Sequence, residues 1–216
     1  MKSFGVIRTF SKAVEEGDLC VFIGDQLCKE ANYYDRYGNL YLTDCCNAIS
    51  VGLGIALNTT RRVFIFCFDD YALANIHDLI QVSVSKIKNI YIIILCSGEY
   101  SSVGKYPTLL GSINSFHGML FNIGFTVHDY SRYFDNQQGL HREFRDIWER
   151  IRGPMVVIVK IEHFIKKDLD ETKDMLYYID RTKSFLLDDG VPSFDYKNPM
   201  YGNEFFVSTG GKINAL

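Results

Sequence analysis

The stretch Val63-Phe64-Ile65-Phe66-Cys67-Phe68 decides the fold class, together with a second apolar run at Ile90–Cys96. Neither run alternates polar and apolar residues, as a strand with one face in water would. Strands that are buried on both faces are typical of parallel sheets covered by helices on each side. These two runs therefore predict the centre of a parallel sheet.

Shorter apolar runs and longer stretches of helical period alternate around this centre. Further strands are expected at Leu19–Ile23, Leu40–Leu42, Phe125–His128 and Met155–Ile161. Helices are expected at Ser3–Glu16, Gln26–Arg36, Cys46–Asn58, Ala72–Ser85, Gln138–Arg152 and Asp168–Leu187. The alternation predicts an α/β fold, a three-layer sandwich with a central, mainly parallel sheet of about six strands. Residues 1–187 are expected to form this domain, and the aromatic residues 188–216 to form a C-terminal extension packed on the domain or on a partner subunit.

Composition narrows the classes of function. The 216 residues carry 23 Lys and Arg against 26 Asp and Glu, a net charge of −3, and no basic cluster that would follow a polyanion. We therefore expect no nucleic-acid partner. No apolar run reaches the roughly 20 residues that span a bilayer, and the first residues do not form a signal peptide. The six cysteines include no CxxC pair, so we expect a reduced, cytoplasmic protein with no membrane association.

The residues after each strand are the candidates for a functional site, because ligands of parallel sheets bind outside the carboxyl ends of the strands. Asp69-Asp70 follows the first apolar run, and Ser97-Gly98-Glu99 follows the second. Thr43-Asp44-Cys45-Cys46-Asn47-Ala48 follows the strand expected at Leu40–Leu42.

In this order the segments resemble the diphosphate-binding domain of thiamine diphosphate enzymes, most nearly the sulfopyruvate and phosphonopyruvate decarboxylases. In that family a GSMGHA turn precedes a helix ending in LGIAL; this chain has TDCCNA before Leu53–Leu57. The family's DGDG turn corresponds to Cys67–Asp70, its DNG turn to Cys96–Gly98, and its STGGQPT stretch to Ser102–Thr108. The resemblance covers about residues 1–165 and is nearest to the β-chain type, which forms a separate subunit.

The resemblance implies a cofactor, thiamine diphosphate, held through a magnesium ion. Carried over position by position, the metal ligands would be Asp69, Ser97 and the backbone carbonyl of Glu99. The same correspondence places Asp70, Cys45 and Cys46 against the cofactor. The pyrimidine-binding domain, which supplies the glutamate that this chemistry needs, is not in this chain, so the resemblance also implies a separate partner chain.

The chain departs from the family at the positions that would face the cofactor. Phe68 and Asp70 replace two glycines, and Ser97 replaces an asparagine. Phe68 would fill cofactor space unless its ring turns into the core, and Asp70 would place a second carboxylate beside two phosphates. Cys45 and Cys46 replace the family's methionine and a glycine. From the residues alone, Asp69 is either a helix cap or a metal ligand, and Ser97-Gly98 is either a plain turn or part of the metal site.

Two hypotheses follow. The first is a degenerate, non-catalytic relative of the decarboxylase β chain that serves as an assembly or interaction subunit. The alternative is an active β subunit of a 2-oxo acid decarboxylase that binds thiamine diphosphate and Mg²⁺ together with a pyrimidine-domain chain. Under either hypothesis we expect a homo-oligomer, a complex with such a chain, or both.

Overall fold

The computed structural model describes residues 2–43, 47–100, 106–108, 113–130, 137–150, 153–162 and 175–187. Its centre is one six-stranded sheet in the order β2-β1-β3-β4-β6-β5, and every strand pairing is parallel. The strands are β1 (Leu19–Ile23), β2 (Asn39–Leu42), β3 (Val63–Phe68), β4 (Ile90–Cys96), β5 (Thr126–Asp129) and β6 (Met155–Lys160). The predicted parallel sheet of about six strands is thus confirmed.

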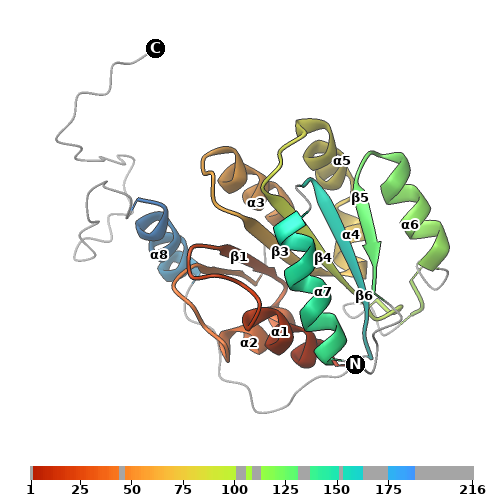
Figure 1. Cartoon of the computed structure of the whole chain (residues 1–216), viewed down its shortest axis with the longest axis horizontal. Coiled ribbons are helices and arrows are strands. Elements are labelled where there is room, and N and C mark those ends of the chain that lie inside the picture. Colours follow the sequence, from red (N-terminus) through yellow and green to blue (C-terminus); the bar gives the residue numbers. More distant parts are fainter. Residues whose placement is uncertain are drawn as a thin grey trace.

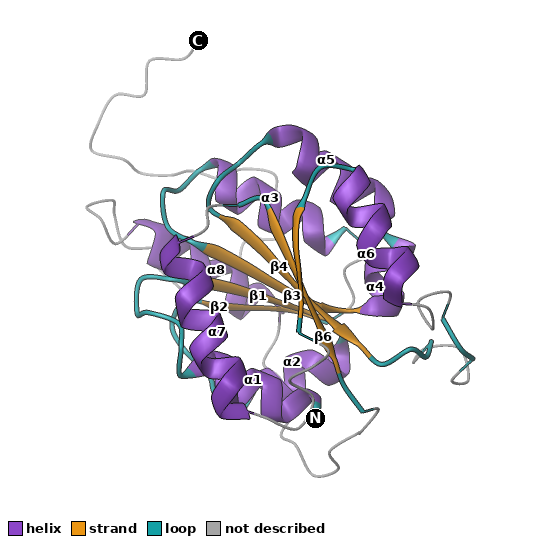
Figure 2. Ribbon diagram, turned by 45° about the vertical axis from the view of Figure 1, so that its right-hand side comes forward, coloured by secondary structure: helices purple, strands orange, loops and turns teal. Residues whose placement is uncertain are grey.

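Helices cover both faces of this sheet, which gives the predicted three layers (Figure 1, Figure 2). One face carries α1 (Ser3–Ser11), α2 (Asp25–Asn32) and α7 (Gln137–Arg150). The opposite face carries α3 (Ala48–Leu57), α4 (Asp69–Ala74), α5 (Ile76–Ser85) and α6 (Ile113–Asn122). The last described helix, α8 (Met175–Leu187), packs against the edge strand β2.

The centre of the sheet is fully buried, as its continuous apolar runs predict. Every residue of β4 is buried, and so are the first five residues of β3. On the α1 and α7 side, the Phe10 ring lies 4.3 Å from the Phe66 ring and 4.9 Å from the Trp148 ring, measured between centroids. Such edge-to-face aromatic packing adds specific geometry to the burial of apolar area.

The helices α1 and α2 end at Ser11 and Asn32, before the predicted ends at Glu16 and Arg36, and two further helices differ more strongly from the prediction. The helix expected at Ala72–Ser85 begins earlier, at Asp69, and is broken at Asn75, whose φ and ψ of −114° and 37° lie outside the helical range. The Asn75 side chain donates to the carbonyl of Tyr71 at 2.9 Å, which competes with the helical backbone pattern. The sequence prediction did not include α6, whose segment carries no charged residue and has Gly118, a weak helix former, near its centre.

Helix α8 is fixed to the β2 edge by a buried arginine. Arg181 is 7% exposed and donates to both carboxylate oxygens of Asp35, at 2.7 and 2.9 Å, and to the carbonyl of Asn39. The part of the predicted helix before Met175 and the predicted extension 188–216 lie outside the described residues. Within the described part of the chain, no helix has the length and apolarity needed to cross a membrane.

Candidate functional site

The carboxyl ends of β3 and β4 meet at the candidate site. Residues Val63–Phe68 pair in register with Ile90–Leu95, so the segments that follow the two strands emerge side by side. Strand β3 passes directly into α4: Phe68 is extended, with φ and ψ of −78° and 162°, and Asp69 is the first helical residue. Neither Phe68 nor Asp70 has a positive φ. The backbone at these positions therefore does not need the glycines of the family's turn.

Asp69 is completely buried, and its carboxylate is surrounded by donors from the segment after β4. Oδ1 lies 3.1 Å from the backbone nitrogen of Ser97 and 3.2 Å from the Ser97 hydroxyl. Oδ2 lies 3.1 Å from the backbone nitrogen of Gly98 and 3.1 Å from the Thr108 hydroxyl. A carboxylate offers about four lone-pair positions, so these contacts occupy its capacity as an acceptor.

The segment that supplies these donors folds back on itself. Gly98 has a φ of 76°, which favours glycine, and turns the chain at the end of β4. The Thr108 amide then donates to the Gly98 carbonyl at 2.9 Å, and the Tyr100 amide donates to the Tyr106 carbonyl at 2.7 Å. Asp69 thus joins β3 to both arms of this return, at residues 97–98 and at residue 108.

The three predicted metal ligands are brought together. The Ser97 hydroxyl oxygen lies 3.2 Å from Asp69 Oδ1 and 3.2 Å from the Glu99 carbonyl oxygen. Neighbouring ligands of Mg²⁺ are about 3 Å apart, and carboxylate, hydroxyl and carbonyl oxygens are ligands of the hard type that it takes. In this arrangement, however, hydrogens from Ser97, Gly98 and Thr108 point at the Asp69 oxygens. Among the described residues, no group of three or more His, Cys, Asp or Glu side chains could hold a metal ion.

Phe68 and Asp70, on either side of Asp69, are the residues that would lie next to a cofactor's diphosphate. The Phe68 side chain is half-buried and packs against the hydrophobic core, so the ring turns inward. Asp70 is 9% exposed, and its Oδ1 accepts a hydrogen bond from the Tyr71 amide at 2.7 Å. Two carboxylates therefore begin α4, where a diphosphate would need positive charge or free N–H groups. As the residues stand, the site does not fit a cation with a bound diphosphate.

Burial raises the pKa of Asp69 above its ordinary value, although the hydrogen bonds from Ser97, Thr108 and Gly98 act in the opposite direction. Burial likewise raises the pKa of the neighbouring thiols of Cys67 and Cys96, and the nearby Asp69 carboxylate adds to this effect. Thiols in such surroundings stay protonated and unreactive. Cys45 and Cys46, which were predicted to face the cofactor, lie outside the described residues.

One of the two interpretations left open by the sequence is decided by this geometry. The hypothesis that Asp69 caps the following helix is wrong, because α4 begins at Asp69 and the carboxylate accepts its hydrogen bonds from the segment after β4. The chain bends at Gly98, as both a plain turn and a metal-binding turn would, so the second alternative stays a prediction. Thr108 is the site residue that the sequence reading did not single out. The signal was present, since Pro107-Thr108 matches the end of the family's STGGQPT stretch.

Two known proteins are similar to this chain in sequence. The chain is 30% identical over 112 residues to the β subunit of sulfopyruvate decarboxylase from Methanocaldococcus jannaschii, a match of 51% of this chain and 60% of that subunit. It is 34% identical over 80 residues to the sulfopyruvate decarboxylase of Methanosarcina acetivorans, which covers 37% of this chain and 19% of that protein. The chain thus spans less than two thirds of these relatives. No family model matches it.

A solved structure supports the fold independently. The X-ray structure of a protein assigned as a thiamin diphosphate-dependent enzyme from Mycobacterium smegmatis superposes with a TM-score of 0.56. The match covers 75% of this chain and 31% of that one, at 14% identity. The chain therefore has the thiamine diphosphate-binding fold, and the resemblance of its sequence to the diphosphate-binding domain of the sulfopyruvate decarboxylases, of the β-chain type, is confirmed.

Proposed function

We propose that this chain is a non-catalytic relative of a thiamine diphosphate-dependent decarboxylase β chain, which has kept the fold and serves as an assembly or interaction subunit. The observation that carries the proposal is the environment of Asp69. The one acidic residue retained from the family's metal-binding turn is completely buried and filled by donors from Ser97, Gly98 and Thr108. Its hydrogen bonds join the end of β3 to the segment after β4, and we call this set of contacts the Asp69 clip.

The neighbouring residues support the same proposal. Bringing a diphosphate to this turn would set its charge against Asp70, which is almost fully buried. Two like charges about 4 Å apart repel by roughly 4 kcal/mol at the dielectric typical of a protein surface. Phe68 stands where the family has a glycine, and its side chain packs against the hydrophobic core. This contact stabilises the domain but adds nothing to cofactor binding.

The alternative, an active β subunit, is favoured by one observation. The Ser97 hydroxyl oxygen lies 3.2 Å from Asp69 Oδ1 and 3.2 Å from the Glu99 carbonyl oxygen, spacings that also occur between the ligands of a small cation. An ion could take this position only if the Ser97 and Thr108 hydroxyl hydrogens turned away and the turn shifted both backbone amides. Under this alternative the cofactor would be thiamine diphosphate with Mg²⁺, and a separate pyrimidine-domain chain would complete the active site.

Under both functions we propose a cytoplasmic protein with a protein partner. The partner proposal is supported by the relative from Methanocaldococcus jannaschii, which is named as a β subunit.

Calorimetry separates the two functions. The full chain is titrated with thiamine diphosphate in the presence of Mg²⁺, alone and mixed with a pyrimidine-domain chain of a sulfopyruvate decarboxylase. The proposal expects no heat above dilution in either case. Micromolar binding that is lost in Asp69→Ala would establish the active subunit instead.

A restored variant serves as the positive control. Phe68→Gly, Asp70→Gly and Ser97→Asn together return the family's residues to the turn. If these positions abolished binding, the restored variant should bind the cofactor in the mixture whereas the natural chain does not. Binding by the natural chain equal to that of the restored variant would refute the degenerate reading.

A further inference from the structure

A cavity with a volume of about 520 Å³ opens between α8 and the segment that precedes β2, and we call it the α8 cavity. Its wall on the helix side consists of Tyr177, Arg181 and Ser184, which are four and three residues apart and so share one face of α8. The opposite wall is the segment Asp35–Tyr37. Cavities that bind small molecules commonly have volumes of about 300–1,000 Å³. The α8 cavity is therefore large enough for a small metabolite.

The α8 cavity lies far from the Asp69 carboxylate. The segment Asp35–Tyr37 comes before β2 and so lies at the amino end of that strand, whereas Asp69 follows the carboxyl end of β3. Every strand pairing in the sheet is parallel, so these are opposite ends of the strands. A ligand in the α8 cavity would therefore be separate from a cofactor bound at the family's turn.

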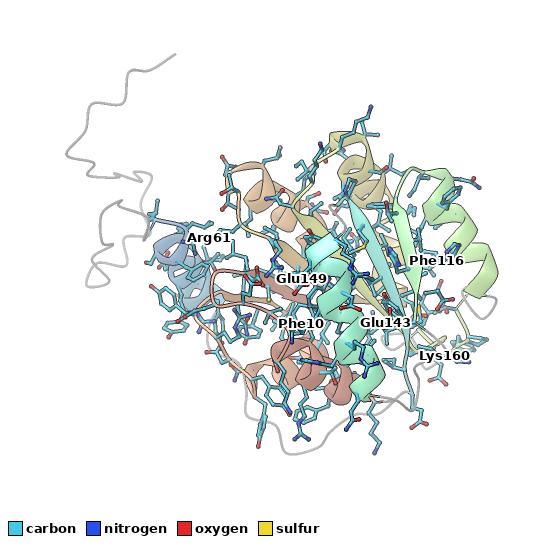
Figure 3. All side chains as sticks on the ribbon, in the orientation of Figure 1. Phe10, Arg61, Phe116, Glu143, Glu149 and Lys160 are labelled. Atoms are coloured by element: carbon cyan, nitrogen blue, oxygen red, sulfur yellow. The ribbon has the colours of Figure 1, made fainter. Side chains whose placement is uncertain are left out.

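The two walls of the α8 cavity are fixed to each other. Arg181 donates to both carboxylate oxygens of Asp35, at 2.7 and 2.9 Å, and the centroid of the Tyr37 ring lies 5.5 Å from that of Phe185 on α8. Arg61 lies beside α8, with its guanidinium 4.4 Å from the centroid of the Phe185 ring (Figure 3). Because these contacts preform the cavity, a ligand would not lose binding energy by ordering it.

Arg36 gives the α8 cavity a positive charge that no carboxylate offsets. Its half-buried guanidinium donates to the backbone carbonyl of Glu15 and approaches Cys20 Sγ at 3.6 Å. Burial raises the pKa of the Cys20 thiol to about 12, so this partner is neutral as well. Among the described residues, Arg36 forms no ion pair, and the neighbouring carboxylate of Asp35 pairs with Arg181. The planar guanidinium of an arginine matches the geometry of a phosphate, so an anion of this type fits beside Arg36.

The other lining groups suit a base and a sugar. Tyr37 and Tyr177 are 50% and 36% exposed, so their rings can stack with a flat ring. Asp35 Oδ1 accepts from Tyr41 and Arg181, whereas Oδ2 accepts from Arg181 alone, which leaves an acceptor position for a sugar hydroxyl. The Asp35 side chain is 37% exposed and can be reached from the cavity.

We propose that the α8 cavity binds a nucleoside monophosphate. In this arrangement the phosphate lies against Arg36, the base against Tyr37 and Tyr177, and a sugar hydroxyl against Asp35. Inorganic phosphate would leave the two rings and the carboxylate unused, and an uncharged nucleoside would leave the Arg36 charge unused. The inference goes beyond the proposed function, because it concerns a different place in the fold.

The test is calorimetry of the full chain with adenosine 5′-monophosphate (AMP) in EDTA, so that no divalent cation takes part. We expect a Kd below about 1 mM for AMP, and at least about tenfold weaker binding of adenosine and of inorganic phosphate. Arg36→Met should weaken AMP binding by about 10- to 100-fold, because it removes a charge-assisted hydrogen bond. The matched control is Arg145→Met, the same change at an exposed arginine of α7, which should leave the Kd unchanged. Circular dichroism and thermal melting establish that both variants are folded.

Hydrogen exchange on the natural chain keeps the proposal open to refutation if Arg36→Met fails to fold. Saturating AMP should slow amide exchange in peptides that contain residues 35–39 and 176–184, and leave exchange at residues 63–74 unchanged. Three results would each overturn the proposal: no AMP binding below about 1 mM, equal affinity for AMP and for adenosine or inorganic phosphate, or slower exchange only at residues 63–74. The cofactor titration uses Mg²⁺ and a different ligand, so failure of this proposal and failure of the proposed non-catalytic function are separable.

Discussion

The substitution Asp69→Asn tests the clip most directly, because it keeps the shape of the side chain and changes only its hydrogen bonding. The amide group must replace one of the two carboxylate oxygens. If the amide group replaces Oδ1, its N–H groups face the backbone N–H of Ser97; if it replaces Oδ2, they face the backbone N–H of Gly98. Neither backbone N–H has another acceptor among the described contacts. The hydroxyls of Ser97 and Thr108 can rotate to accept, but the backbone amide cannot.

The magnitude follows from these contacts. A polar group that loses its only partner costs about 1–3 kcal/mol, and the hydrogen bonds that remain lose the strength that the negative charge gave them. Burial of the charge opposes this, since it raises the pKa of Asp69, and removing the charge returns part of the cost. We expect a net loss of about 2–3 kcal/mol in the free energy of unfolding, or about 5–10 °C in Tm for a chain of this size.

The assay is thermal and urea unfolding in EDTA, so that no divalent cation contributes. The single tryptophan, Trp148, is 5% exposed in the aromatic core and reports unfolding by its fluorescence. The control is Asp25→Asn, the same chemical change at a carboxylate that is 60% exposed, begins α2 and pairs with Lys29, and it should cost about 1 kcal/mol or less. Thr108→Val combined with Asp69→Asn should be non-additive, because the two side chains share a hydrogen bond. An Asp69→Asn variant with the same free energy of unfolding as the parent in EDTA would refute the reasoning. A carboxylate that served only to bind a metal ion would contribute little to stability when no metal is present.

Three further outcomes are expected. Arg181→Met should lower the free energy of unfolding by about 1–3 kcal/mol, because the Asn39 carbonyl and Asp35 lose this donor; Asp35 keeps its hydrogen bond from Tyr41 and is 37% exposed, so the loss is smaller than for a fully buried pair. Arg145→Met at an exposed site of α7 should cost little, and equal effects of the two changes in urea unfolding would contradict this. Iodoacetamide should leave four buried thiols unmodified until denaturant is added: Cys20, Cys28, Cys67 and Cys96. Burial raises the pKa of Cys20 to about 12 and also raises the pKa of Cys67 and Cys96, so these thiols stay protonated. Peptide mapping that finds any of the four labelled in the native protein would contradict this packing. Burial lowers the pKa of His128 below its ordinary value of 6.5, so the folded state binds fewer protons and stability should fall as pH drops below about 6.5; His128→Gln should flatten this slope, and identical slopes would exclude the effect.

The sheet could be predicted from the sequence because its signal is local. Val63–Phe68 and Ile90–Cys96 are apolar without interruption, and this pattern alone indicates strands covered on both faces. Helix α6 was missed because its polar residues are uncharged and Gly118, a weak helix former, lies near its centre.

The position of the site could be predicted from the sequence, but the hydrogen bonds around the Asp69 carboxylate could not. The strand ends correctly brought Asp69, Ser97 and Glu99 to one place. The sequence could not show that the carboxylate would be filled by the Gly98 amide and the Thr108 hydroxyl. Those contacts depend on a return of the chain across ten residues, and nothing in the local pattern fixes the direction of a side chain after such a return.

The central claim is that the Asp69 carboxylate belongs to the fold and not to a metal site. A crystal structure of the full chain grown with millimolar thiamine diphosphate and Mg²⁺ tests it most directly. We predict that both Asp69 oxygens remain within hydrogen-bonding distance of Ser97, Gly98 and Thr108, with no ion beside them. A cation about 2.1 Å from an Asp69 oxygen, bridging to a bound diphosphate, would contradict the account.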